Sequence, residues 1–233
     1  MLEQLKEEVL EANLELVRHG LVLYTFGNAS GISRDEGLVA IKPSGVPYEK
    51  MRPSDLVVVD LNGNRVEGSL RPSSDLPTHL VLYRAFSQIG GVVHTHSRAA
   101  TTWAQAGREI PCLGTTHADY FHGCVPVTEP LSETDIQNDY EQNTGTAIVK
   151  RFAGLDPLAL PGVLVHGHAP FTWGTSPAEA AHTAVVLEEI AEMAWRTLGL
   201  NASCGPVSNV LLDKHFFRKH GSRAYYGQRT GEE

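Results

Sequence analysis

The sequence predicts a layered α/β fold around a mostly antiparallel or mixed sheet. Apolar residues recur at helical spacing near the start of the chain and again over 176–198, whereas the middle holds short apolar runs broken by glycine-rich turns. Of the 233 residues, 42% are hydrophobic and 20% are charged, which is ordinary for a globular protein that buries a core. We expect one large domain over 1–233 rather than two small ones, with 222–233 as a polar C-terminal tail.

Each element follows from a local pattern. A first helix is expected over 2–17, with Gly20 suited to its C-cap. The Asn62–Gly63 pair predicts a tight turn between two strands. Ser176 and Glu179, with a proline between them, predict the capped start of a long helix. The other strands are expected within 21–33, 37–46, 90–97 and 161–174, and the other helices within 73–86, 99–106 and 209–221.

Composition and charge argue against several kinds of partner. The formal net charge of −8 disfavours nucleic acid, whose phosphates reward clustered lysine and arginine. No apolar run approaches the ~20 residues that a membrane-spanning helix needs, so we expect no membrane partner. The N-terminal stretch carries glutamates rather than the basic start of a signal peptide, and three scattered cysteines indicate a reducing compartment. A cytoplasmic protein is therefore expected.

The stretch GGVVHTHSRAA, residues 90–100, places two histidines at the end of an apolar run. Residues two apart on a β-strand point to the same side, so His94 and His96 would project together. Two neutral imidazoles so placed are able to bind a divalent metal such as zinc, with bonds of about 2.0–2.1 Å. Taken alone, the pair is better explained by ordinary polar residues at a strand end.

A second pair repeats the pattern. His166 and His168 lie two apart at the end of the apolar run in PGVLVHGHAPFTWG, and would also share one side of a strand. Asp75 adds a carboxylate, although a helix N-cap explains that residue without a metal. Three imidazoles and one carboxylate are a common ligand set for a catalytic divalent ion. The pattern leaves open which of His166 and His168 is the ligand and which is a supporting or structural residue.

Three short polar turns suit an anion such as phosphate. Glycine admits the close approach of a backbone N–H, and serine hydroxyls at a helix start add donors. Lys42 would contribute positive charge. Each turn alone is weak evidence, because these residue pairs are common in turns. The turns are Gly27–Asn28, Lys42–Gly45 and Pro72–Asp75.

Two further stretches hold groups that are able to carry protons. Residues 115–122 contain Asp119 among threonines and histidines, and residues 213–228 contain His215 and Tyr226. A tail that ends in tyrosines is able to close over a site. The residues by themselves favour a solvated tail instead.

Taken together and in this order, the motifs resemble those of the class II sugar-phosphate aldolase/epimerase family, and its epimerases in particular. The resemblance extends over 1–228. Phe26 stands where the family usually has tryptophan, and RTGEE extends past the usual end, but neither falls on an expected ligand. The motifs are FGN, IKPSG, PSSD, GGVVHTHS, GTTHADYF, PGVLVHGHAPF, VLEEIA and the C-terminal LLDKH, RKHG and AYYGQ.

The resemblance implies a three-layer α/β/α sandwich around a central, largely antiparallel sheet. It also implies a C4 homotetramer with active sites at subunit interfaces, and Zn²⁺ as cofactor, with Mn²⁺ or Co²⁺ as alternatives. The implied metal ligands are Asp75, His94, His96 and His168. The implied phosphate-binding residues are Gly27, Asn28, Lys42, Ser44, Gly45, Ser73 and Ser74. The implied acid and base are Asp119 and Tyr226, the latter from a neighbouring subunit, with Thr115, Glu141 and His215 as supporting residues.

The implied activity is that of an isomerase of pentose phosphate metabolism, for instance in arabinose catabolism. It would epimerise L-ribulose 5-phosphate at C4 to D-xylulose 5-phosphate. The C3–C4 bond would break and re-form by retro-aldol and aldol steps through a metal-bound enediolate. Two proton carriers on opposite sides are what inversion at this carbon requires.

Alternative interpretations belong to other classes. A class II aldolase could act on a related ketose phosphate, although such aldolases generally carry glutamate where this chain has Asp75. An inactive relative could serve as a binding module, as the adducin head domain does, but the complete set of three histidines and Asp75 argues against it. A structural-zinc protein would not need Asp119, Tyr226 or the phosphate turns.

Overall fold

The computed structural model describes residues 2–221 and 224–226, so most of the predicted tail over 222–233 lies outside the described residues. The described chain forms a seven-stranded sheet in the order β4-β3-β2-β1-β5-β7-β6, in which all neighbouring strands are antiparallel. The strands are β1 (Asn28–Ser33), β2 (Leu38–Ile41), β3 (Val57–Asp60), β4 (Arg65–Glu67), β5 (Gly91–His94), β6 (Gly162–Leu164) and β7 (Pro170–Gly174).

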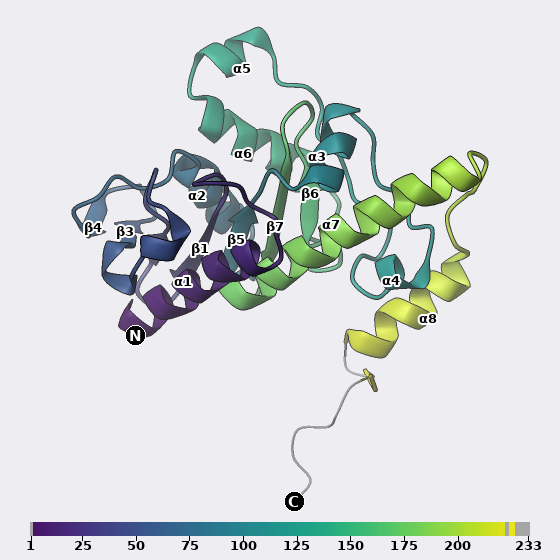
Figure 1. Ribbon diagram of the computed structural model, residues 1–233, viewed down its shortest axis with the longest axis horizontal. Coiled ribbons are helices and arrows are strands. Elements are labelled where there is room, and N and C mark those ends of the chain that lie inside the picture. The colour runs from purple at the N-terminus through teal and green to yellow at the C-terminus, as the bar shows by residue number, and fades with distance from the viewer. Residues whose placement is uncertain (1, 222–223, 227–233) are drawn as a thin grey trace, which may run out of the picture.

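Helices cover both faces of this sheet, which confirms the predicted α/β/α sandwich. The helices α1 and α7 run side by side along one face, and α2 and α6 lie on the other (Figure 1). The helices are α1 (Leu2–Arg18), α2 (Leu76–Ala85), α3 (Arg98–Gln105), α4 (Thr115–Ala118), α5 (Glu133–Gln137), α6 (Tyr140–Arg151), α7 (Pro177–Leu200) and α8 (Asn209–Lys219), with 3₁₀ turns at Tyr48–Lys50 and Pro53–Asp55.

The strand side chains alternate between the two helical layers. Val57 and Val59 belong to the core that includes α2, whereas Val58 joins the core beneath α1. Val92 and Val93 of β5 divide between the two sides in the same way. Because both faces are buried, these strands consist of continuous apolar runs rather than an apolar and polar alternation.

Several expected elements are confirmed. The strands β3 and β4 pair as a hairpin whose turn contains Gly63 in the left-handed region, at φ +86°. The helix α7 begins after Ser176, whose side chain accepts a hydrogen bond from Glu179 N at 3.2 Å. Glu179 reaches back to Thr175 N at 2.6 Å, one residue before the N-cap.

The expectation of one strand within 161–174 is wrong. This stretch is a hairpin of β6 and β7, and its turn is closed by bonds from Val165 N to Ala169 O and from His168 N to Val165 O, both at 3.0 Å. Gly167 sits in the left-handed region at φ +70°, which suits glycine and reverses the chain between the two histidines. The strand β5 ends at His94, so His96 lies just past it, but the two rings still project side by side as predicted, with centroids 4.9 Å apart.

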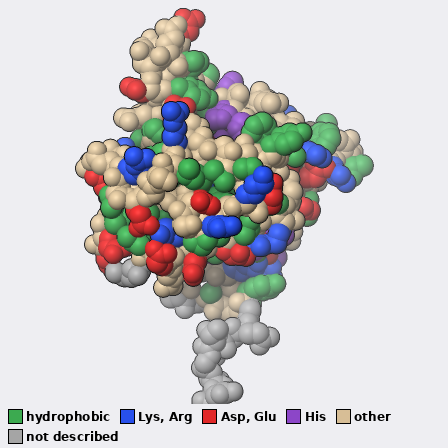
Figure 2. All heavy atoms as spheres, turned by 60° about the vertical axis from the view of Figure 1, so that its left-hand side comes forward, with side chains coloured by type: hydrophobic (Ala, Val, Ile, Leu, Met, Phe, Trp, Pro, Cys, Tyr) green, Lys and Arg blue, Asp and Glu red, His purple; other side chains and the backbone are tan. Residues whose placement is uncertain are grey.

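Among the described residues, no helix is long and apolar enough to span a membrane. On the face shown in Figure 2, acidic and basic side chains are interspersed, and a group of histidines is visible among uncharged atoms in the upper part. This face therefore offers no dense basic stripe for nucleic acid.

Candidate active site

Three histidines from two distant parts of the chain converge at one end of the sheet. His94 is the last residue of β5, His96 follows two residues later, and His168 lies in the turn before β7. One ring nitrogen of each lies within 4.8 Å of the others. The Nε2 atoms of His94 and His96 are 3.1 Å apart. A tetrahedral zinc site with bonds of about 2.0–2.1 Å separates its ligand atoms by roughly 3.3 Å, so this spacing suits a metal.

Two of these rings are oriented by neighbours. His94 Nδ1 lies 3.0 Å from the carbonyl oxygen of Pro170, and because a carbonyl only accepts, Nδ1 carries the proton and Nε2 keeps a lone pair. The same ring stacks on Phe171 at a centroid distance of 4.2 Å. His168 Nδ1 faces the Tyr140 hydroxyl at 3.3 Å. A hydrogen bond on the far ring nitrogen is the usual support of a metal-binding histidine.

The environment favours the neutral form of His96 and His168. Although His96 is exposed, partial desolvation of its ring lowers its pKa, and the nearby His94 lowers it further. Burial, with His94 and His96 close by, lowers the pKa of His168 to about 4. Neutral imidazole is the form that binds metals, so the donor set fits a divalent ion such as zinc.

The structure separates the two histidines that flank Gly167. His168 joins the cluster, whereas His166 lines a different cavity of about 830 Å³ and packs against Gly107. His166 N donates to Thr128 Oγ1 at 3.1 Å. The expectation that both share one side of a strand is thus wrong, because a turn and not a strand joins them.

The histidine cluster opens into a cavity of about 490 Å³. All the residues expected to bind phosphate line this cavity, together with Asp75 and Glu141. The phosphate-type residues lining it are Gly27, Asn28, Lys42, Ser44, Gly45, Ser73 and Ser74. Gly27 brings the loop before β1 close to β5, because a Cβ at this residue would lie only 2.9 Å from His94 O. Its φ of +73° also suits glycine.

Lys42 is the buried cation of this cavity. Its Nζ donates to Thr25 O at 3.1 Å and to Pro43 O at 3.4 Å and lies over the Tyr48 ring, which leaves one of its three N–H donors. Burial lowers the pKa of Lys42, and the charge of Asp75 opposes this effect. A buried cation with a spare donor favours an anionic ligand.

The backbone donors near Lys42 divide into two groups. Ser44 N and Ser73 N already donate to Arg71 O and Lys42 O. By contrast, no hydrogen bond within the described residues uses the N–H groups of Gly45 and Ser74. An anion in this cavity would therefore meet the N–H groups of Gly45 and Ser74 and the serine hydroxyls.

Asp75 occupies the N-cap position of α2 without making a capping bond. Its Oδ2 instead accepts from Asn28 Nδ2 at 2.6 Å. Burial alone would raise the pKa of Asp75, but the nearby His94 and His79 and the Asn28 bond outweigh burial and lower it. Asp75 thus lines the cavity as an ionised carboxylate outside the set of three converging nitrogens, and its role as a ligand stays a prediction.

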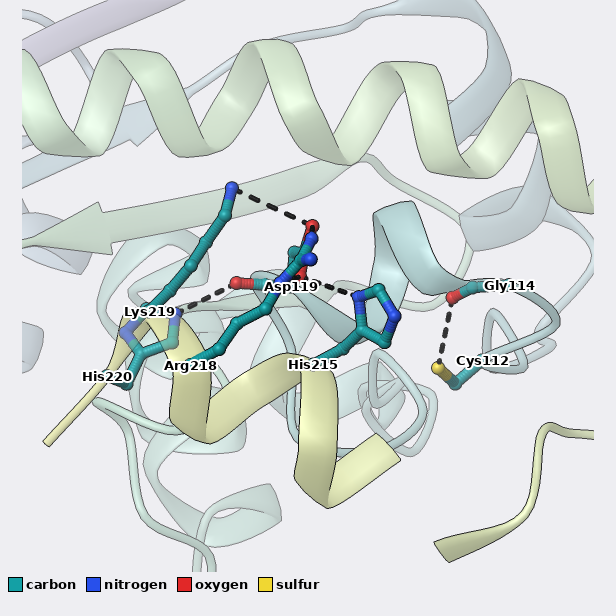
Figure 3. A network of polar contacts seen from close by, with 7 residues as sticks. All are labelled: Cys112, Gly114, Asp119, His215, Arg218, Lys219 and His220. Atoms are coloured by element: carbon teal, nitrogen blue, oxygen red, sulfur yellow. Dashed lines mark hydrogen bonds and ion pairs between the residues drawn. The ribbon is translucent and has the colours of Figure 1, made fainter. Parts of the chain in front are cut away.

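A second polar cluster surrounds Asp119, at the end of α4 (Figure 3). Its carboxylate accepts from His215 Nδ1 at 2.9 Å, from Arg218 Nε at 3.0 Å and from Arg218 Nη2 at 2.7 Å, with Lys219 Nζ at 3.8 Å. Burial would raise the pKa of Asp119, but Arg218, His215 and Lys219 outweigh burial and lower it.

Tyr226 lies on the same cluster. Arg218 is 4.8 Å and Lys219 Nζ 4.6 Å from the centre of its ring, and Tyr226 is 61% exposed. Thr115 starts α4, and its carbonyl oxygen accepts from Asp119 N at 2.9 Å. The structure therefore brings Asp119, Tyr226, His215 and Thr115 together, but none of them lines the histidine cavity.

A comparison with known protein families shows to which family this chain belongs. The model of the class II aldolase and adducin N-terminal domain matches residues 7–195. The chain belongs to this family. Its similarity to curated family members extends over nearly all of its length. It is 54% identical over 228 residues to L-ribulose-5-phosphate 4-epimerase UlaF of Salmonella paratyphi C and of Salmonella choleraesuis, covering 98% of this chain and 100% of each relative.

Two solved structures share the fold of this chain. An L-fuculose 1-phosphate aldolase superposes with a TM-score of 0.78 at 24% identity, covering 92% of this chain and 95% of the other. YgbL of Klebsiella pneumoniae gives a TM-score of 0.73 at 25% identity, covering 92% and 98%.

The sequence did not reveal three residues that contact these two clusters. Arg218 and Lys219 bind Asp119, and their spacing of three and four residues from His215 on one helix was an available signal, because such residues share a helix face. Tyr140, which faces His168, had no comparable signal in the sequence, because the contact joins α6 to a turn 28 residues away.

Proposed function

We propose that this chain is an L-ribulose-5-phosphate 4-epimerase, an isomerase that converts L-ribulose 5-phosphate to D-xylulose 5-phosphate by inversion at C4. The observation that carries the proposal is the single cavity that joins three converging histidines to Lys42 and the serine turns. That cavity matches a sugar phosphate, which needs a Lewis acid at one end and an anion site at the other. The 54% identity to relatives with this name supports the same substrate.

His94, His96 and His168 would hold the metal, with Asp75 as the fourth ligand. Zinc is the proposed ion, because neutral imidazoles and one carboxylate suit it, and Mn²⁺ or Co²⁺ are alternatives. The bound ion supplies Lewis-acid stabilisation of the negative charge that develops on substrate oxygens when the C3–C4 bond breaks.

The chain's own residues bind the substrate and move its protons. Lys42, Ser44 and Ser74 hold the phosphate, so that the two-carbon fragment stays in place while its aldehyde turns. Asp119 and Tyr226 exchange the proton of the C4 hydroxyl from opposite sides, as inversion requires.

A second copy of the chain completes this site. Asp119 and Tyr226 lie beside α8 and do not line the cavity of their own chain. We therefore propose that a neighbouring subunit presents Tyr226 to the cavity, in a C4 homotetramer with active sites at its interfaces.

The test is an assay of the purified protein on L-ribulose 5-phosphate, with and without a chelator, that follows both D-xylulose 5-phosphate and free glycolaldehyde phosphate. We expect chelator-sensitive formation of D-xylulose 5-phosphate without released aldehyde. Released aldehyde would identify a class II aldolase instead. No turnover of any pentulose phosphate, by a protein purified without metal, would favour the binding-module interpretation.

A further inference from the structure

Of the three clustered histidines, His96 has the least support. Pro170 and Tyr140 face the far nitrogens of His94 and His168, whereas within the described chain the ring of His96 has only His94 as a hydrogen-bonding neighbour. Sheet hydrogen bonds do not reach it, because β5 ends at His94, and His96 is exposed. The direction of its ring therefore depends on the backbone on either side.

The backbone after His96 is fixed by the start of α3. Ser97 occupies the N-cap position of this helix, but its side chain makes no capping bond. The hydroxyl is buried and has no partner among the described residues. The usual way of satisfying the first N–H groups of a helix is thus missing here.

Glu188, in the middle of α7, provides the cap instead. Its Oε1 accepts from Ala99 N at 2.7 Å, and its Oε2 accepts from Ala100 N at 3.0 Å. Hydrogen bonds to an ionised carboxylate are stronger than neutral ones, and negative charge is favourable at a helix N-terminus. The carboxylate therefore clamps the chain three residues after His96.

The same helix supports the other two ligands. The helix α7 packs on β5, which ends in His94, and on β7, which follows the turn that holds His168. The bonds from Glu188 therefore fix the segment after His96 to the same helix that packs against the strands carrying or following His94 and His168.

We propose that Glu188 is a positioning residue of the metal site, which sets the direction of His96 by capping α3. The inference rests on the metal-binding part of the proposed function. It gives a role to the VLEEIA motif, which contains no residue of the cavity. Residues that support a metal ligand from behind typically change metal affinity by about 10–100-fold when they are altered.

The test compares Glu188→Gln with Glu189→Gln. Both variants remove one negative charge from the same helix, but Glu189 is exposed and makes no hydrogen bond within the described residues. Zinc affinity of each apoprotein is measured by competition with a chelating dye, the visible spectrum of the Co²⁺ form reports ligand geometry, and Tm reports the fold. We expect Glu188→Gln to weaken zinc binding by about 10–100-fold and to change the Co²⁺ spectrum, with Glu189→Gln like the wild type.

A merely structural cap gives a different result. A lower Tm for Glu188→Gln with zinc affinity within about twofold of the wild type, and an unchanged Co²⁺ spectrum, would overturn the inference. If Glu188→Gln does not fold, Glu188→Asp decides the question: it keeps the charge but is one methylene shorter, and we expect a smaller but measurable loss of affinity, whereas wild-type affinity would overturn the proposal.

The proposed function fails in a distinguishable way. A wild-type protein that binds zinc but does not turn over L-ribulose 5-phosphate would overturn the proposed reaction, while the affinity ratio of the variants still decides the role of Glu188. A wild-type protein that binds no zinc would overturn both.

Discussion

The histidine cluster and the Asp119 cluster are built in opposite ways. The first stands at the end of the sheet, where burial lowers the pKa of His168 to about 4 and so favours its neutral form. The second stands between a short helix and α8, where Arg218 and Lys219 keep a carboxylate ionised. An imidazole must be deprotonated at the nitrogen that binds a metal. A carboxylate that accepts a proton must be ionised beforehand, and neighbouring positive charges favour that ionised form.

The two clusters also differ in how their residues are aligned. Strand register places Asn28 opposite His94, and His94 opposite Phe171, at the same end of β1, β5 and β7. Helical spacing places His215, Arg218 and Lys219 on one side of α8. Sheet hydrogen bonds reach His94 of the first cluster, whereas side-chain ion pairs hold the second. If the proposed function is right, each cluster fails separately when altered.

The largest effect is expected from His96→Ala, which removes one of the three converging nitrogens. Bound metal and activity should be lost together, with turnover reduced by about 10³-fold or more, because charge on the substrate is no longer stabilised. Metal analysis and the epimerase assay on the same sample check this. An active variant that holds no metal would contradict the zinc assignment.

Tyr226→Phe should affect the second cluster alone. The phenyl ring keeps its place beside Arg218 and Lys219, but the hydroxyl that would carry a proton is gone. We expect turnover to fall by about 10²–10⁴-fold with metal content and Tm unchanged. Near-normal turnover would mean that Tyr226 has no catalytic role.

Lys42→Met should separate phosphate binding from metal binding within the cavity, because it removes the cation of the anion site and leaves the histidines intact. Methionine is of similar length and needs no partner for a buried charge. We expect KM for the sugar phosphate to rise by about 10–100-fold with metal affinity unchanged, since a hydrogen bond to a charged group contributes about 1.5–3 kcal/mol. An unchanged KM would show that phosphate binds elsewhere.

The smallest effect concerns stability near the Asp119 cluster. His117 is buried in α4 and its Nε2 donates to Gly123 O at 2.8 Å; burial lowers its pKa to about 4, against the opposing effect of that bond. The unfolded chain takes up a proton near its ordinary pKa of about 6.5 and the folded chain does not, so stability is present above that pH and is lost as the pH falls towards 4.

The expected loss between pH 7 and pH 5 from this one group is about 2 kcal/mol of unfolding free energy. Denaturant unfolding at both pH values measures it. His117→Gln keeps a donor for Gly123 O but does not titrate, so its stability should fall less over this range. Equal slopes for the two proteins would show that His117 is not the group responsible.

Local patterns predicted much of the fold. The cap at Ser176 and the turn at Asn62–Gly63 involve residues a few positions apart, so their chemistry is visible in a short window. The 161–174 hairpin was mistaken for one strand, because His-Gly-His continues the alternation and only the left-handed conformation of Gly167 reverses the chain. His94 and His168 converge as expected, but the argument that His166 and His168 share one side of a strand was incorrect, because a turn joins them.

Contacts between distant segments were not predictable from the sequence. Glu188 caps a helix 88 residues away, Tyr140 faces a histidine across 28 residues, and Arg218 binds a carboxylate across 99. Such pairs depend on how the layers pack rather than on any local period. Only the resemblance to known sequences selected His168 over His166.

The strand order has a consequence for synthesis of the chain. The strand β5 pairs with β1 on one side and with β7 on the other, so its two edges are completed by segments that leave the ribosome far apart in time. Until His168 has emerged the histidine triad lacks its third member, and until β7 has followed it β5 has a bare edge. Contacts of such long sequence separation form late, because loop closure must come first. The triad thus exists only once the central sheet has closed, and a nascent chain that stalls before β7 offers a free edge to other chains.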